Sequence, residues 1–146
     1  MIVIVPDASV LLKWALPADD EPDFNAAIAL RNAALERRAL LKLPSLWLYE
    51  VGNTLARRLP DQCKELLEVL IAFELEESVF TDEWLDHALA LTEAYGVTFY
   101  DAAYHAVAMV EKGLFVTADG KYVQKAGNAG SVVVLRDWRI PFGKNN

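Results

Sequence analysis

The segment VTFYDAAYHAVAMVEKG, residues 97–113, most restricts what this chain can fold into. Nearly every residue from position 99 to position 110 is apolar or aromatic. A helix that is apolar all round is normally buried, so the rest of the chain must surround it. The segment nevertheless carries Asp101 and His105 one turn apart on one stripe. A carboxylate in an apolar interior needs a partner or loses its charge, so Asp101 needs an explanation.

Short β-branched runs alternate with helical segments along the chain. Strands are predicted over residues 2–5, 41–43, 79–80, 114–117 and 131–135, and helices over residues 8–14, 23–38, 46–58, 60–74, 83–94, 97–113 and 121–126. Ser45 and Asp82 are expected to cap helices at their start, and Gly96 to end one. This alternation predicts a three-layer α/β/α sandwich with a mainly parallel sheet. The length of 146 residues and the lack of repeats predict a single domain over residues 1–146.

The amino-acid composition favours a folded protein over a disordered or membrane-spanning one. A hydrophobic content of 54% and a charged content of 24% favour a full core over disorder. No apolar run reaches the ~18–20 residues of a membrane helix, so no membrane partner is expected. The N-terminal run MIVIVP lacks the basic region of a signal peptide. The lone Cys63 excludes an internal disulfide and fits a reducing compartment, which predicts a cytoplasmic protein.

The net charge of −7 argues against broad nucleic-acid binding, which depends on Lys and Arg. It does not argue against a site for divalent cations, because such a site must itself be acidic. Two histidines and one cysteine are too few for a zinc site built from nitrogen and sulfur.

Four acidic residues occupy places where chemistry is expected. Asp7 directly follows the first predicted strand, and Asp119 follows the strand at 114–117. The carboxyl ends of parallel strands meet at one edge of a sheet, where ligands bind. Asp101 lies in the first turn of the apolar helix, and Glu50 lies at the flank of the apolar stripe of the helix at 46–58.

Each acid also has a purely structural explanation. Asp7 can cap a helix, Asp119 can belong to a turn with Gly120, and Asp101 can form a capping box with Thr98. Glu50 can lie on a solvated helix face, and His105 can be a packed core histidine. Lys13, Lys121 and Lys125 follow Asp7 and Asp119 and can either touch phosphates or be ordinary solvated lysines.

The four acids and the residues around them resemble the motifs of a known protein family. Asp7 in VPDASVLLKW, Glu50 in LYEVGNTL, Asp101 in TFYDAAYHAVA and Asp119 in VTADGKYVQKAG stand in an order that resembles the PIN-domain family, and in particular its VapC-type toxins. The match runs from residue 2 to about residue 135. The resemblance implies a metal-dependent ribonuclease, the toxin of a type II toxin–antitoxin pair, whose acids converge on Mg²⁺ or Mn²⁺. It also makes Ser9, Asn53 and Thr117 supporting residues.

Physical chemistry is consistent with these implications. Two carboxylates ~4 Å apart repel by about 4 kcal/mol at an effective dielectric near 20, so four acids in one pocket need protons or cations. We expect Asp7, Asp101 and Asp119 to hold the principal ion, and Glu50 to bind a second ion or orient water. The apolar helix is then predicted to be buried except along the stripe of Asp101, His105 and Lys112. The resemblance further implies an RNA substrate, a homodimer and a cognate antitoxin that blocks the site.

Other functions remain open from the sequence alone. A phosphatase of the haloacid-dehalogenase type needs a second Asp two residues after the first, where this chain has Ser9. A phospho-receiver domain needs an acid pair after its first strand, and Asp7 has no adjacent acid. A non-catalytic protein- or RNA-binding module of the same fold, with the acids as structural caps, is the remaining alternative.

Overall fold

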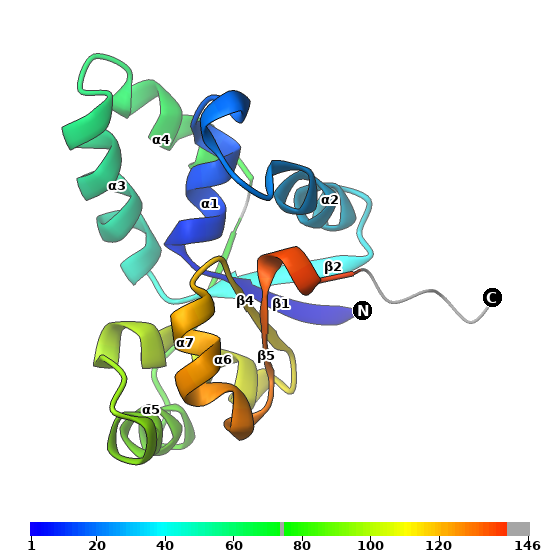
Figure 1. The fold of residues 1–146 in the computed structure, drawn as a ribbon, viewed down its shortest axis with the longest axis vertical. Helices are drawn as coiled ribbons and strands as arrows, with labels where there is room; N and C mark the ends of the chain where they lie inside the picture. The colour runs from blue at the N-terminus through cyan, green and yellow to red at the C-terminus, as the bar shows by residue number, and fades with distance from the viewer. Residues whose placement is uncertain (74, 140–146) are drawn as a thin grey trace.

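The sheet lies between two layers of helices in the computed structural model, which describes residues 1–73 and 75–139 (Figure 1). Its strands are β1 (Ile2–Pro6), β2 (Ala39–Leu43), β3 (Glu76–Glu77), β4 (Leu114–Thr117) and β5 (Val132–Val134). They run in the order β3-β2-β1-β4-β5, and every pair of neighbours is parallel. The predicted three-layer α/β/α sandwich with a parallel sheet is therefore confirmed.

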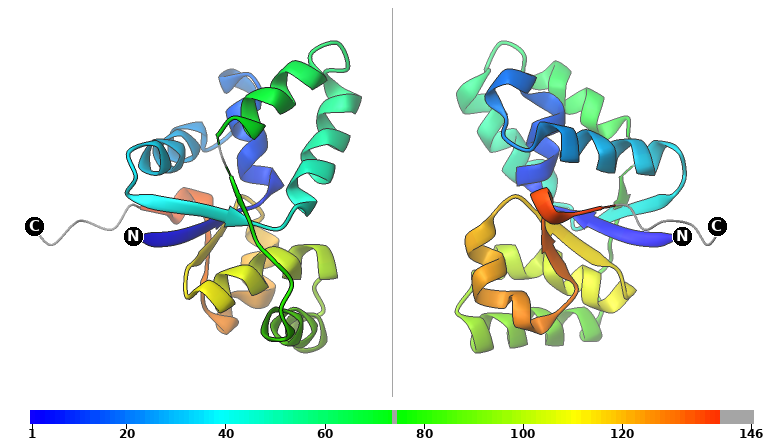
Figure 2. Two further views of the ribbon diagram at one scale, coloured as in Figure 1. Left: turned by 180° about the vertical axis from the view of Figure 1, so that it is seen from behind. Right: turned by 45° about the vertical axis from the view of Figure 1, so that its right-hand side comes forward.

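The helices divide between the two faces of the sheet. Figure 2 shows α1 to α4 on one side and α5 to α7 on the other in both views. The helices are α1 (Ala8–Ala15), α2 (Phe24–Leu35), α3 (Leu46–Arg58), α4 (Cys63–Ile71), α5 (Asp82–Tyr95), α6 (Phe99–Glu111) and α7 (Gly120–Ala126), with short 3-10 turns η1 (Ala18–Asp20), η2 (Gly127–Ala129) and η3 (Leu135–Asp137). Within the described residues, none of these helices combines the length and the apolar character that a membrane crossing needs.

Alternate residues of the central strand pack into different parts of the core. Ile4 of β1 belongs to the apolar cluster that contains Leu30 of α2, whereas Val5 belongs to the cluster that contains Val107 of α6. All four residues are buried, as expected for a parallel strand covered on both faces. The apolar run at the N-terminus therefore serves both layers at once.

The edge strand lies elsewhere than the sequence predicted. The strand predicted at residues 79–80 is wrong: β3 is Glu76–Glu77, and Val79 and Phe80 are 75% and 86% exposed. Backbone pairing of Glu76 with Lys42 decides the strand here, and charged side chains suit an exposed sheet edge.

Capping predictions were partly wrong. Thr81, not Asp82, caps α5, because its Oγ1 accepts a hydrogen bond of 3.0 Å from the Trp84 amide. Ser45 does occupy the N-cap position of α3, but its side chain makes no capping hydrogen bond. Gly96 ends α5 in the left-handed conformation with φ of 67°, as predicted.

Helix α6 and the glycine after it fix the spacing between α6 and β1. The helix ends at Glu111, where Lys112 adopts a left-handed φ of 54°. A Cβ on Gly113 would lie 2.3 Å from the Val3 carbonyl oxygen, so only glycine allows the chain to pass this close to β1. Strand β4 then begins directly beside β1 and carries Thr117 to the edge where β1 ends.

Candidate functional site

Asp7 is a buried carboxylate at the carboxyl end of β1. It caps α1 by accepting a 3.1 Å hydrogen bond from the Ser9 amide at Oδ1, where the Ser9 hydroxyl also donates. The Thr117 hydroxyl donates to Oδ2 at 2.7 Å. Burial raises the pKa of Asp7 to about 6, although the hydroxyls of Ser9 and Thr117 lower it and the charge of Asp101 raises it further. The capping role is therefore real, but it leaves a carboxylate whose charge is incompletely stabilised.

Ser9 and Thr117 tie Asp7 to the end of the neighbouring strand. The Ser9 hydroxyl accepts a 3.0 Å hydrogen bond from the Ala118 amide, and the Thr117 hydroxyl accepts one of 3.1 Å from the Asp119 amide. Each hydroxyl thus donates to Asp7 and accepts from the chain after β4. Both residues lie where the sequence predicted supporting groups, and their hydrogen bonds fix the Asp7 carboxylate at this edge of the sheet.

Asp119 caps the short helix α7 and faces solvent. Its Oδ1 accepts hydrogen bonds from the amides of Lys121 and Tyr122 at 3.0 and 3.4 Å. Among the described residues, its Oδ2 accepts none. The turn that the sequence suggested for Asp119 and Gly120 is this helix start, and one carboxylate oxygen remains available to a ligand.

Asp101 lies in the first turn of α6 and is half-buried. The Thr98 hydroxyl accepts a 3.1 Å hydrogen bond from the Asp101 amide, but the described residues contain no return bond from the Thr98 amide to the Asp101 carboxylate. The predicted capping box is therefore only half formed. Burial raises the pKa of Asp101, and so does the charge of Asp119, while the Thr98 hydroxyl and Lys125 lower it.

Glu50 reaches toward Asp101 from α3, and Tyr104 of α6 holds it. The Tyr104 hydroxyl donates to Glu50 Oε1 at 2.6 Å. Burial raises the pKa of Glu50, and the charge of Asp101 adds to the effect. The sequence prediction named Asn53 as the support of Glu50, but Asn53 is exposed and has no hydrogen bond to it among the described residues. Tyr104 was missed, although its place three residues after Asp101 puts both on one side of α6.

The four acids form a linked electrostatic group. Asp101 raises the pKa of Asp7 and of Glu50, and Asp119 raises the pKa of Asp101. All the donor atoms are carboxylate oxygens, which suit Mg²⁺ or Mn²⁺. Within residues 1–73 and 75–139, no three Asp, Glu, His or Cys side chains are close enough to hold one ion together. The expected joint binding of one ion by Asp7, Asp101 and Asp119 is therefore not seen among these residues. Carboxylate oxygens remain the ligand type through which Mg²⁺ binds when it keeps several of its waters.

His105 belongs to a separate cluster and is a packed core histidine, which is the structural explanation that the sequence suggested for it. It is completely buried, its Nε2 lies 2.7 Å from the Gly130 carbonyl, and its Nδ1 lies 2.7 Å from the Tyr122 hydroxyl. Because a carbonyl only accepts, Nε2 carries the proton and Nδ1 accepts from Tyr122. Burial lowers the pKa of His105, so the ring is neutral. The predicted exposed stripe on α6 is therefore wrong at His105.

The basic residues near the acids have different environments. Lys13 is buried and pairs with Glu21 at 3.5 Å, so it is neither a solvated lysine nor free to touch phosphates. Lys125 is close enough to Asp101 to lower its pKa. Lys121 and Arg136 line an open hollow of about 1000 Å³ that begins at Asp119.

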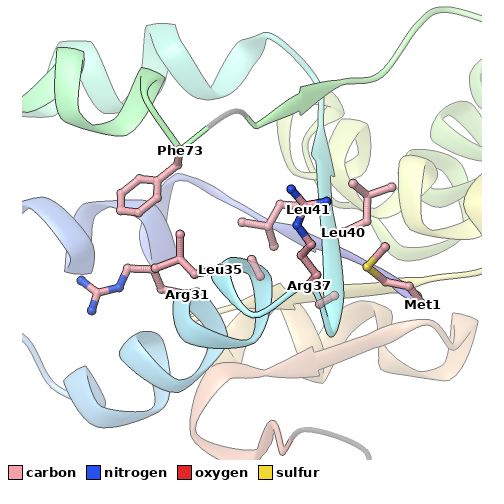
Figure 3. A pocket seen from close by; sticks show the side chains of 9 residues that line it. Met1, Arg31, Leu35, Arg37, Leu40, Leu41 and Phe73 are labelled. Carbon is pink, nitrogen blue, oxygen red and sulfur yellow. The ribbon is translucent and has the colours of Figure 1, made fainter.

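A second, smaller pocket lies away from the acids. Figure 3 shows this cavity of about 300 Å³, lined by apolar side chains and by Arg31 and Arg37. Met1, at the amino end of β1, is part of its wall, whereas Asp7 follows the carboxyl end of that strand. No acid lines it, so it is distinct from the acid cluster.

Several solved structures resemble this chain, two of which illustrate the likeness. The crystal structure of PAE2754 from Pyrobaculum aerophilum superposes with a TM-score of 0.64 at 21% identity and covers 92% of this chain and 91% of its own. The crystal structure of VapBC2 from Rickettsia felis, bound to a DNA fragment from their promoter, gives a TM-score of 0.66 at 14% identity and covers 91% of this chain and 97% of the matched chain. At these identities the likeness establishes the fold alone.

Sequence comparison is decisive for the family. No curated protein sequence matches the chain. The model of the PIN domain, however, matches residues 4–128, which include all four acids. The chain belongs to the PIN domain family.

Proposed function

We propose that this protein is a metal-dependent endoribonuclease in which Asp7, Glu50, Asp101 and Asp119 form the catalytic site. PIN domains are generally nucleases, so membership of the family supports hydrolysis of a phosphodiester. The observation that carries the proposal is the convergence of the acids: the Thr117 hydroxyl links the Asp7 carboxylate to the Asp119 amide, and Tyr104, one turn after Asp101, holds Glu50. The charge of Asp101 raises the pKa of both Asp7 and Glu50, which agrees with this proximity. Carboxylates used only as helix caps have no need to repel one another at one sheet edge.

The acids have distinct tasks in this proposal. Asp7 and Asp101 bind the principal cation, Asp119 contributes its free Oδ2 directly or through water, and Glu50 orients the attacking water or binds a second ion. Ser9 and Thr117 keep the Asp7 carboxylate at the sheet edge. A bound Mg²⁺ or Mn²⁺ supplies Lewis acidity, which polarises a phosphoryl oxygen and makes water more acidic.

The surroundings of Asp119 can give RNA access to the site. The hollow lined by Lys121 and Arg136 opens next to it, and both side chains are exposed. Cationic side chains there can bind backbone phosphates, which position a strand without reading its sequence. Cations in the site would also reduce the repulsion between the acidic protein and the RNA.

The toxin role is part of the same proposal. The matched chain of the VapBC2 structure from Rickettsia felis, which is bound to a DNA fragment from their promoter, has the fold of this chain. We infer that this protein is the toxin of a type II toxin–antitoxin pair, that it acts in the cytoplasm as a homodimer, and that a cognate antitoxin blocks the acid cluster.

The test is cleavage of labelled RNA by metal-free protein to which Mn²⁺ or Mg²⁺ is added. We expect cleavage that requires the cation and that Asp7→Asn abolishes. Asp86→Asn on α5 is the matched control, because Asp86 is exposed and belongs to none of the contacts of the site. Absence of cleavage by the wild type with varied RNAs and both metals would instead favour the non-catalytic binding module.

A further inference from the structure

Glu50 is the one acid of the cluster that reaches the site from α3. This helix packs through its buried residues Trp47, Val51 and Leu55, which lie in the core cluster shared with Leu11 of α1. Figure 1 shows α3 on the opposite side of the sheet from α6. The packing of α3 fixes its backbone, but it does not fix the Glu50 carboxylate, which extends from the flank of the helix.

Tyr104 of α6 fixes the Glu50 carboxylate from the other side of the site. Its side chain is 1% exposed, and its ring stacks on Phe115 of β4 with centroids 6.0 Å apart and planes 9° from parallel. The hydroxyl ends 2.6 Å from Glu50 Oε1, across 54 residues of sequence. A tyrosine has only two main side-chain torsions, so a ring held in this way places its hydroxyl with little freedom.

We propose that Tyr104 is a positioning residue that holds Glu50 for cation binding. Its hydroxyl occupies Oε1 and leaves Oε2, which accepts no hydrogen bond among the described residues, directed to the cation or its water. Tyr104 stands one turn after Asp101, so a single turn of α6 provides both an acid of the cluster and the anchor of the acid on α3. This inference rests on the proposed function, because it assigns Tyr104 a role toward the cation of that site.

The Asp7 carboxylate is also held by hydroxyl groups. Hydroxyls of Ser9 and Thr117 hold both of its oxygens, whereas Glu50 has one hydroxyl on one oxygen. Partners of this kind set the orientation of ligating carboxylates, and their loss typically costs 10–100-fold in metal affinity or activity.

The experiment is calorimetric titration of Mn²⁺ into metal-free protein, with Tyr104→Phe compared with the wild type. The phenylalanine keeps the stacked ring and removes only the hydroxyl. We expect Mn²⁺ affinity to fall about 10-fold and kcat for RNA cleavage to fall more than KM rises. Tyr95→Phe is the matched control, because it also removes a tyrosine hydroxyl, that of a half-buried residue at the end of α5 that touches none of the acids through a hydrogen bond in the described part of the chain. It should leave Mn²⁺ affinity within about 2-fold of the wild type.

A double-mutant cycle with Glu50→Ala separates positioning from a general structural effect. If Tyr104 acts through Glu50, adding Tyr104→Phe to Glu50→Ala changes Mn²⁺ affinity little further. Equal loss in both backgrounds, or unchanged affinity in Tyr104→Phe alone, would overturn the inference while leaving the nuclease proposal intact. If the wild type binds no Mn²⁺ and cleaves no RNA, both proposals fall.

Fluorotyrosine NMR keeps the inference testable if Tyr104→Phe does not fold. Mg²⁺ added to the labelled wild type should shift the Tyr104 resonance, because the cation draws charge from the carboxylate that accepts its hydrogen bond. The resonance of Tyr49, which is exposed on α3, should not move. A Tyr104 signal that ignores Mg²⁺ while the protein binds it would contradict the assignment.

Discussion

Helix α6 contributes one residue to each of two polar clusters, and the clusters differ in whether their polar atoms have hydrogen-bond partners. In the histidine cluster (His105, Tyr122 and Gly130), both ring nitrogens of a fully buried imidazole have partners at 2.7 Å, and the ring is neutral. In the acid cluster (Asp7, Glu50, Asp101 and Asp119), one oxygen each of Glu50 and Asp119 accepts no hydrogen bond from the described residues, and the charge of Asp101 raises the pKa of both Asp7 and Glu50. Burial alone therefore does not mark a functional site. Incomplete compensation of charge is the property that distinguishes the acid cluster.

The largest expected effect separates the two clusters by activity. Asp101→Asn removes the charge that connects the other acids and should reduce RNA cleavage by at least about 1000-fold, because a carboxylate that binds the cation is lost. The fold should remain, since the amide is isosteric and repulsion decreases. Single-turnover cleavage together with circular dichroism checks both statements. Near-normal cleavage by this variant would remove Asp101 from the site.

The histidine cluster should respond in stability instead. His105→Ala leaves a cavity and strips partners from the Tyr122 hydroxyl and the Gly130 carbonyl, so the free energy of unfolding should fall by about 3 kcal/mol. Urea unfolding measures this change. Cleavage per folded molecule should stay within about 3-fold of the wild type. A loss of cleavage comparable to that of Asp101→Asn, in a folded protein, would mean that the two clusters act as one.

The pH dependence of stability tests the incomplete compensation at Asp7. The ordinary pKa of the Asp7 carboxyl is 3.8, and burial raises the pKa to about 6 in the folded protein. Between these values the folded protein binds the extra proton, so its stability is fully present below pH 4 and falls as pH rises through 6. The metal-free protein should lose about 3 kcal/mol of stability from this group, and Asp7→Asn should reduce the loss. Urea unfolding from pH 4 to pH 8 measures it, and stability that rises over this range with no effect of Asp7→Asn would contradict it.

Added cation should restore part of the stability that the metal-free protein loses as pH rises. This is the smallest of the four expected effects. At a Mg²⁺ concentration 10 times the dissociation constant, the free energy of unfolding should rise by about 1.4 kcal/mol. The rise should be present in His105→Ala and absent in Asp7→Asn. Thermal unfolding with Mg²⁺ and with a chelator checks this. Equal stabilisation of both variants would place the cation outside the acid cluster.

Much of the fold could be predicted because local chemistry and tertiary structure agree. The run that includes Ile4 and Val5 became a central parallel strand, and the apolar segment after Thr98 became the buried helix α6. The edge strand could not be predicted in the same way. Its position depends on backbone pairing with Lys42 rather than on side-chain preference, so Val79 and Phe80 misled the prediction.

The acids of the candidate site were named from the sequence because their places after strands and at helix starts constrain them. Their partners were harder to name. Asn53 lies one helical turn from Glu50, but it points to solvent, whereas Tyr104 lies 54 residues away and makes the contact. His105 shares a stripe with Asp101, yet α7 and the chain at Gly130 cover it. Contacts between distant segments decide these roles, and helical spacing alone does not show them.

The most direct test is a crystal structure grown with Mn²⁺ and measured at the manganese absorption edge. We predict an anomalous peak beside Asp7 and Asp101, with a carboxylate oxygen of at least one of them about 2–2.3 Å from the ion. Tyr104 should still donate to Glu50, with Oε2 on the side of the ion. A peak elsewhere, or none at the carboxyl ends of β1 and β4 at saturating Mn²⁺, would contradict the account.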